Sequence, residues 1–189
     1  MSLELLKARI EAVGQIFSAE GTQQRISAAA AFAVIGEYKQ RIFTDGLATD
    51  GTPIGQYSTR PFYQNPNALV GVPTSGIVPQ GRTGKTQFNN GKPYKTKYLA
   101  RGYAELRELT GRQSGTVDLN LSGSLERSIQ VVQEGATASI RYTNEFETVK
   151  MEGNETRFSR TISEPTEDER ETGIRAAQLE VQAILNEIA

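Results

Sequence analysis

Residues 44–97 interrupt the regular pattern of the chain, and this interruption constrains the fold more than any other feature of the sequence. Gly, Pro, Thr, Asn and Gln dominate the stretch, with turn pairs at Asp45-Gly46, Asp50-Gly51, Asn65-Pro66 and Asn90-Gly91. Connections in compact domains are usually far shorter than about fifty residues, and long exceptions are typical of functional arms or disordered segments. We therefore expect one domain, residues 1–189, with residues 44–96 inserted in it as a long extended or partly disordered arm.

The arm is basic, although the chain as a whole is not. Lys and Arg number 21 and Asp and Glu 22, so the net charge is −1 and gives no general reason to expect a nucleic-acid or membrane partner. Residues 51–104 nevertheless contain seven cations and no acid, whereas residues 144–189 carry a net charge of −6. The seven cations, our candidate contacts to another subunit or to DNA, are Arg60, Arg82, Lys85, Lys92, Lys95, Lys97 and Arg101.

Aromatic residues are interleaved with these cations, among them Tyr57, Tyr63 and Tyr98. Rings and cations together can stack on bases and bind phosphates, so residues 51–104 are a candidate nucleic-acid contact. An arm that wraps the acidic surface of a neighbouring subunit explains the same residues without DNA, and we favour that interpretation. A plain solvated loop is the third interpretation.

The absence of His, Cys and Trp removes much familiar catalytic chemistry. Ser-His-Asp and Cys-His nucleophiles, thiolate or imidazole zinc sites and redox-active thiols are excluded. Residues 81–86 lack the first glycine of a P-loop, since Pro79 stands in its place, and no suitable helix follows. A cluster of acids lacks the pattern of a calcium loop and fits a solvated helix start; its members are Glu164, Glu167, Asp168, Glu169 and Glu171. We expect no enzyme activity and no cofactor, with a carboxylate-based hydrolase as the remaining alternative.

Two helices are expected before the arm. Apolar residues at alternating steps of three and four form one stripe over residues 3–17, and Gly21 is expected to end that helix. The second helix should cover about residues 23–43, with an alanine-rich middle that allows another helix to approach closely. We expect both stripes to pack in a core; the alternative is a surface kept for a partner.

After the arm, the pattern predicts a helix from near Thr96 to Gly111, a strand over residues 117–121 and a helical turn at Leu125 and Glu126. Residues 129–132 and 136–142 read as a hairpin with one face on the core, and residues 144–162 as loop with at most a helical turn. Thr166 and Glu169 fit a capping box that starts a long C-terminal helix.

Together these elements predict an α+β fold: two N-terminal helices, the long extended basic arm, a small mainly antiparallel sheet of three or four strands, and a long C-terminal helix packed on it. No stretch approaches the 18 apolar residues of a membrane span, and the first residues resemble no signal peptide. We expect a soluble protein without a membrane partner.

The order of these features is similar to the virion morphogenesis or tail-completion proteins of tailed bacteriophages. In that family a helix ends in an Arg-Ile-Phe-like stretch, an Asp-Gly turn and a short Tyr-Ser-like segment follow, and a G-x-L-x-x-S-I motif leads into a strand. The matching residues are Arg41-Ile42-Phe43, residues 50–58, Lys97, and the motif residues Gly123, Leu125, Ser128 and Ile129. The glycine would permit a tight backbone, and Leu125 and Ile129 would turn into the core.

The resemblance implies a structural virion protein without catalysis that forms a homo-oligomeric ring at the head–tail joint, in tail completion or neck assembly. Its implied partners are other copies of itself, neck or portal-adaptor proteins, and tail-tube or terminator proteins. The implied locations are the virion and, during assembly, the host cytoplasm. A tail terminator, a head-closure protein and a nucleic-acid-binding module that uses residues 51–104 are the alternatives. The arm is expected to order only on a neighbour or on the tail.

Overall fold

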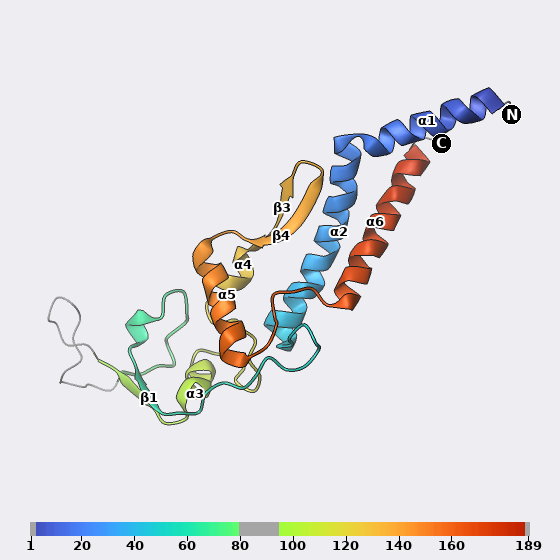
Figure 1. Ribbon diagram of the computed structural model, residues 1–189. Helices are drawn as coiled ribbons and strands as arrows, with labels where there is room; N and C mark the ends of the chain where they lie inside the picture. The colour runs from blue at the N-terminus through green and yellow to red at the C-terminus, as the bar shows by residue number, and fades with distance from the viewer. Residues whose placement is uncertain (1–2, 80–94, 188–189) are drawn as a thin grey trace.

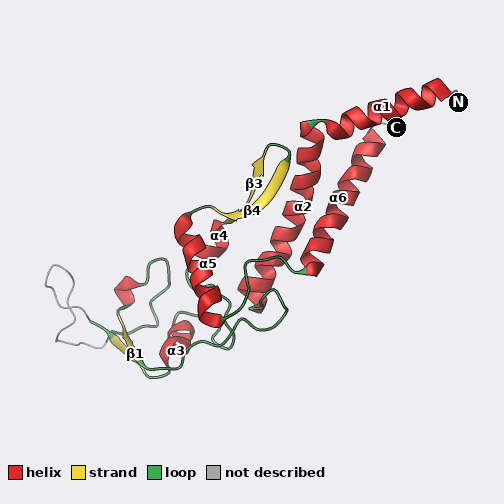
Figure 2. Ribbon diagram, in the orientation of Figure 1, coloured by secondary structure: helices red, strands yellow, loops and turns green. Residues whose placement is uncertain are grey.

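The computed structural model describes residues 3–79 and 95–187 and confirms the α+β class (Figures 1 and 2). Helices α1 (Leu3–Ser18) and α2 (Glu20–Gln40) come first, and α2 continues into a π-helical turn, η1 (Arg41–Asp45). The remaining elements are β1 (Phe62–Gln64), the short 3₁₀ turn η2 (Pro66–Ala68), β2 (Lys97–Leu99), α3 (Gly102–Leu109), α4 (Ser124–Ser128), β3 (Ile129–Glu134), β4 (Thr137–Tyr142), α5 (Glu145–Phe158) and α6 (Glu167–Glu187).

Helices α2 and α6 pack side by side, and the β3–β4 hairpin lies against α2 (Figure 1). Helix α1 extends away from this pair at an angle, while β1 and α3 lie at the opposite end of the molecule. The glycine expected to end the first helix, Gly21, lies inside α2. The break falls at Ala19, whose extended backbone (φ −66°, ψ 133°) separates the two helices.

The described strands form two separate antiparallel pairs instead of one sheet of three or four strands. In the β3–β4 hairpin Ile129 lies opposite Tyr142 and Val131 opposite Ile140, which confirms the hairpin. In the other pair Tyr63 of β1 lies opposite Tyr98 of β2. Lys97–Leu99 is therefore a strand, where we expected the start of a helix.

Two groups of buried apolar side chains hold the described chain together. The main core joins α2, η1, β3 and α5, and it includes Ala48 and Ile54 from the first part of the 44–96 segment. The smaller core consists of Ile77, Leu99 and Leu106, with partly buried side chains around them. The described part of the 44–96 segment thus contributes buried residues to both cores.

Two expectations for the middle of the chain are wrong. Residues 117–121 are not a strand: Leu119 takes a left-handed conformation (φ 52°), and the Asp118 carboxylate accepts the Asn120 N–H at 2.9 Å, so local polar contacts replace a strand ladder. Residues expected to be loop form α5, whose start is capped by Asn144 through a 2.9 Å bond from the Glu147 N–H. The polar composition of α5 concealed it, because few of its side chains are buried.

The C-terminal helix has the predicted start. The Thr166 N–H donates to the Glu169 carboxylate at 2.8 Å, and the Glu169 N–H donates to the Thr166 hydroxyl at 3.1 Å, which is the capping box. None of the described helices is both long and apolar enough to cross a membrane.

Candidate functional site

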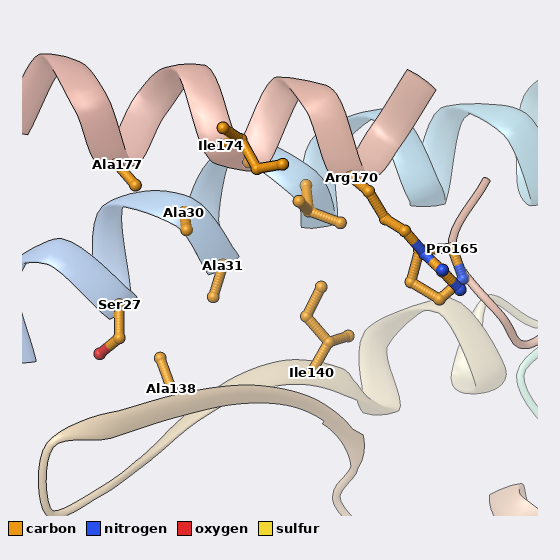
Figure 3. Close-up of a pocket in the computed structure, with 11 residues that line it drawn as sticks. Ser27, Ala30, Ala31, Ala138, Ile140, Pro165, Arg170, Ile174 and Ala177 are labelled. Atoms are coloured by element: carbon orange, nitrogen blue, oxygen red, sulfur yellow. The ribbon is translucent and has the colours of Figure 1, made fainter. Parts of the chain in front are cut away.

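An apolar groove of about 490 Å³ lies between α2, α6 and β4 (Figure 3). Helix α2 supplies Ser27, Ala30, Ala31 and Val34, β4 supplies Ala138 and Ile140, and α6 with the residue before its cap supplies Pro165, Arg170, Gly173, Ile174 and Ala177. We call this the α2–α6 groove. Most of its lining residues are small, so the groove has room for large apolar side chains from a partner.

The small residues explain why the helices approach so closely here. A Cβ added at Gly173 would lie 2.8 Å from Val34 Cγ2 and 3.5 Å from the Ala30 carbonyl oxygen, so a larger residue would require the Val34 side chain or α2 to shift. The Ser27 hydroxyl donates to the Ala136 carbonyl at 2.9 Å and ties the hairpin to α2. The alanine-rich middle of α2 indicated this close approach in the sequence, but it did not identify the partner helix.

A buried ion pair fixes the end of the groove near Pro165. Arg41 Nε donates to the Glu169 carboxylate at 2.7 Å, and both side chains are almost fully buried. The Arg41 guanidinium also donates to the carbonyls of Leu47 and Glu164 at 3.1 and 3.0 Å. Because a buried charge is costly unless it is paired and hydrogen-bonded, this arrangement selects one position for the start of α6.

An exposed ion pair joins the other ends of the two helices. The guanidinium of Arg25 on α2 contacts Glu180 at 2.8 Å and Glu187 at 2.7 Å on α6. The hydrogen bonds from Arg25 hold the pKa of the Glu187 carboxyl below its ordinary value. Ion pairs therefore join α2 and α6, the two helical walls of the groove, on both sides of the Gly173 contact.

The lining of the groove is largely apolar. Among the described residues that line it, Arg170 is the one ionisable group, so no acid–base pair faces the hollow. Large apolar side chains are exposed on the same two helices: Phe32 (65%), Ile174 (57%) and Leu179 (73%). Of these three, Ile174 lines the groove and adds to its apolar surface, whereas Phe32 and Leu179 lie on other faces of the two helices.

The structure describes four of the seven candidate cations, and all four lie in or next to the β1–β2 pair. Arg82, Lys85 and Lys92 lie outside the described residues, as do residues 81–86. Arg101 pairs with Glu108 of α3 at 2.5 Å, so its charge is compensated. Arg60 and Lys95 are exposed beside the β1–β2 pair, and Lys97 is partly buried within β2.

The β1–β2 pair presents an aromatic face. The rings of Tyr63 and Tyr98 lie 5.0 Å apart with an interplanar angle of 51°, and about half of each residue is exposed (51% and 42%). Because side chains alternate along a strand, Lys97 points to the opposite face from Tyr98. The aromatic rings and the described cations are neighbours, but they do not share one strand face.

The residues of the G-x-L-x-x-S-I motif shape the backbone instead of forming a binding surface. Gly123 adopts φ 73° at the start of α4, a conformation that favours glycine. Leu125 and Ile129 are buried in the main core, and the buried Ser128 hydroxyl donates to the Leu125 carbonyl at 2.7 Å. The motif thus connects residues 117–123 to the hairpin.

A second polar network, which the sequence did not indicate, surrounds Asp118. The carboxylate accepts bonds from the Arg107 guanidinium at 2.7 Å and from the Tyr57 hydroxyl at 2.8 Å. Burial raises the pKa of the Tyr57 hydroxyl well above its ordinary value, so this group stays a neutral donor. A cavity of about 140 Å³ lies beside Tyr57 and Arg107, but the polar groups bond to one another, which is the pattern of a structural network.

In residues 3–79 and 95–187 no group of three or more Asp and Glu side chains is placed to hold a metal ion. The acids Glu164, Glu167, Asp168, Glu169 and Glu171 surround the capped start of α6, and Glu169 is committed to Arg41 and to the cap. Comparisons of the chain with protein families, with curated proteins and with solved structures found no match.

Sequence reasoning missed the groove because its walls come from distant parts of the chain. One signal was available: Gly173 and Ala177 are small residues four positions apart, so they lie on one side of α6 and allow another helix to approach. Ala138 of β4 carried no such signal, because a small residue in a strand does not indicate which surface covers it.

Proposed function

We propose that this protein is a structural subunit of a tailed-bacteriophage particle that forms a closed ring at the head–tail joint, in tail completion or neck assembly. The resemblance over residues 41–58 and 121–129 supports the phage context. Tail termination and head closure are variants of the same proposal that differ in which partner surface the ring contacts. In this proposal the protein acts by binding, without catalysis or a cofactor.

The observation that carries the proposal is the open apolar surface on the α2–α6 pair. Ile174 is 57% exposed in a groove lined mostly by small apolar residues, and exposed apolar surface of this kind is typical of a surface that another protein covers. A closed ring requires two different, complementary surfaces on each subunit. The groove supplies one such surface.

Electron microscopy of lysates from a phage that lacks this gene tests the proposal. Filled heads beside complete but unattached tails are the expected result, and normal joined particles would refute a joining role. Complementation then separates the groove from the rest of the molecule. Ala177→Glu places a charge in the groove and should fail to restore joined particles, whereas Gln178→Glu places the same charge on the exposed side of α6 and should restore them.

Thermal unfolding of the two purified variants checks that Ala177→Glu still folds. If both variants are folded and both restore joined particles, the groove has no role in assembly. Restoration by neither folded variant would mean that added charge on α6, and not its place in the groove, prevents assembly.

Nucleic-acid binding through the β1–β2 pair is the second candidate function. The exposed Tyr63 and Tyr98 rings, with Arg60 and Lys95 nearby, are the observation that favours it. Binding of a fluorescent DNA by the isolated chain should then weaken steeply as salt rises, because neutralised phosphates release counterions. Tyr98→Ala should reduce the affinity at every salt concentration, and an affinity that does not respond to salt would exclude this function.

A further inference from the structure

Helix α1 is an amphipathic helix with part of its apolar stripe uncovered. Ile10 is 64% exposed, whereas Val13 and Phe17, nearer to α2, are partly buried. The helix contacts α2 only near their junction and then extends away from the rest of the molecule (Figure 1). At Ile10, therefore, α1 presents an apolar side chain that the described chain leaves largely uncovered.

The α2–α6 groove has the complementary shape. Its lining residues Ala30, Ala31 and Ala177 are small, and exposed Ile174 stands at its edge (Figure 3). Large side chains on one helix pack well into a surface of small ones on its neighbours. A helix of 16 residues is about 24 Å long, which is enough to run along the groove from Arg170 to Ala177.

The charges on the two surfaces are also complementary. Successive residues are about 100° apart around a helix axis. Measured around the axis of α1, Lys7 and Arg9 lie within about 90° of the centre of the apolar stripe that contains Ile10. Glu4 and Glu11 lie about 130° or more from that centre. Lys7 and Arg9 are exposed, so the stripe is flanked by cations on both sides.

The edge of the groove on α6 is acidic. Glu167 and Glu171 are exposed one turn apart, on the same side of α6 as Ile174. These two acids outnumber Arg170, the cation that lines the groove at this end. A helix with flanking cations therefore fits this edge better than one with flanking acids.

We propose that the outer half of α1 from one copy of this chain lies in the α2–α6 groove of a neighbouring copy. This inference rests on the proposed ring and names the contact that closes it. The donor helix and the acceptor groove are different surfaces of one chain, which is the head-to-tail contact that a ring requires. Ile10 enters among the alanines, and whichever of the two flanking cations, Lys7 or Arg9, lies on the α6 side faces the acids of α6.

Cysteine cross-linking tests the contact directly, because the natural chain contains no cysteine. One preparation carries Ile10→Cys and a second, with a tag of different length, carries Ala177→Cys or Ala30→Cys. The preparations are mixed under conditions that allow subunits to exchange, and they are then oxidised mildly. We expect a disulfide-linked pair of unequal chains with at least one groove position, since a disulfide forms only where Cβ atoms approach to about 4 Å.

The matched control pairs Ile10→Cys with Glu152→Cys, an exposed position on α5 outside the groove. A yield at both groove positions no higher than this control overturns the proposed contact. If the unmodified chain still forms rings by electron microscopy, that result leaves the proposed function standing. Joined particles from a phage lacking the gene would instead refute the function, whatever the cross-linking yields.

Exchanging the charges beside the proposed contact tests it in a second way, again through the cross-linking yield. Glu167→Lys with Glu171→Lys in the acceptor should lower the cross-linking yield several-fold, and Lys7→Glu with Arg9→Glu in the donor should restore it. All four side chains are exposed, so these changes preserve both cores. Failure of the donor changes to restore the yield would show that α1 does not face the acids of α6.

Discussion

At the residue scale, two ion pairs of nearly equal length differ in how far water reaches them. Arg107 contacts Asp118 at 2.7 Å with only 1% of its side chain exposed, whereas Arg141 contacts Glu134 at 2.6 Å on the open face of the hairpin. Removing one partner of a buried pair leaves an unpaired charge in a poorly solvated place, whereas an exposed partner is simply hydrated. Burial therefore decides what each pair contributes.

We expect Arg107→Ala to lower the free energy of unfolding by about 3–5 kcal/mol, because the buried charge of Asp118 loses its ion-pair partner. Of the two bonds described above, only that from the Tyr57 hydroxyl then remains to the carboxylate. Arg141→Ala should change it by less than about 1 kcal/mol. Urea unfolding of the two variants measures both values. Similar small losses in both would mean that water reaches the Asp118 network.

The Glu155 carboxylate should make stability depend on acid. Partial burial disfavours its charge, but bonds from the N–H groups of Ser163 and Ile162 and from the Ser163 hydroxyl outweigh that cost and hold its pKa below the ordinary value. A carboxyl with a depressed folded-state pKa stabilises the fold above its unfolded-state pKa, and this stabilisation is lost as the pH falls through the folded-state value.

Glu155→Gln should therefore be less stable than the natural chain at pH 7, and the difference should shrink as the pH falls below the ordinary glutamate pKa of 4.5. Urea unfolding at pH 7 and at about pH 3.5 measures the two differences. Glu152→Gln, an exposed change on the same helix, is the control. A difference that stays constant with pH would contradict the assigned hydrogen bonds.

At the element scale, the contact between α2 and α6 depends on a glycine inside a helix. Glycine weakens a helix interior by about 1 kcal/mol relative to alanine, so its presence requires a compensating contact. Gly173 has one, since an added Cβ would press against Val34. Gly153 of α5 has open space around it, with no heavy atom within 4 Å of an added Cβ.

The same substitution should therefore act in opposite directions at these two glycines. Gly173→Ala should destabilise the protein by about 1–3 kcal/mol through overpacking, in spite of its better helix propensity. Gly153→Ala should stabilise it by about 0.5–1 kcal/mol. Thermal unfolding of both variants shows whether each substitution raises or lowers stability. Stabilisation by both would mean that α6 shifts freely along α2.

At the scale of the whole molecule, the described chain has a larger and a smaller core. The smaller one depends on Ile77, Leu99 and Leu106, and fewer buried side chains hold it together than hold the main core. Segments with few buried apolar contacts open at lower free energy than the rest of a protein. The β1–β2 pair and α3 should therefore open before the α2–α6 pair does.

Leu99→Ala removes a fully buried side chain, a change that typically costs about 2–5 kcal/mol. We expect this cost to open the smaller core while the main core stays folded. Hydrogen exchange followed by mass spectrometry should then show protection lost over β2 and α3 and retained over α2 and α6. Equal loss in all four elements would mean that the two cores unfold together.

Elements whose signals are local can be predicted from the amino-acid sequence alone. The period of α1, the capping box of Thr166 and Glu169 and the alternation of the β3–β4 hairpin are each set by neighbours a few residues apart, so those elements were predicted correctly. The prediction of a strand over residues 117–121 was wrong, because the alternating pattern did not show that Asp118 bonds to Arg107 and Tyr57. Helix α5 was missed because most of its face is polar.

The position of the α2–α6 groove, in contrast, depends on contacts between distant parts of the chain. Its walls depend on the pairing of Arg41 with Glu169 and on the contact of Gly173 with Val34, and each of these joins residues more than a hundred positions apart. Periodicity identifies an apolar face of a helix but not what covers it, because that depends on which distant element can bury the face at least cost. The apolar surface that α2 and α6 leave exposed at the groove is the surface on which the proposed ring depends.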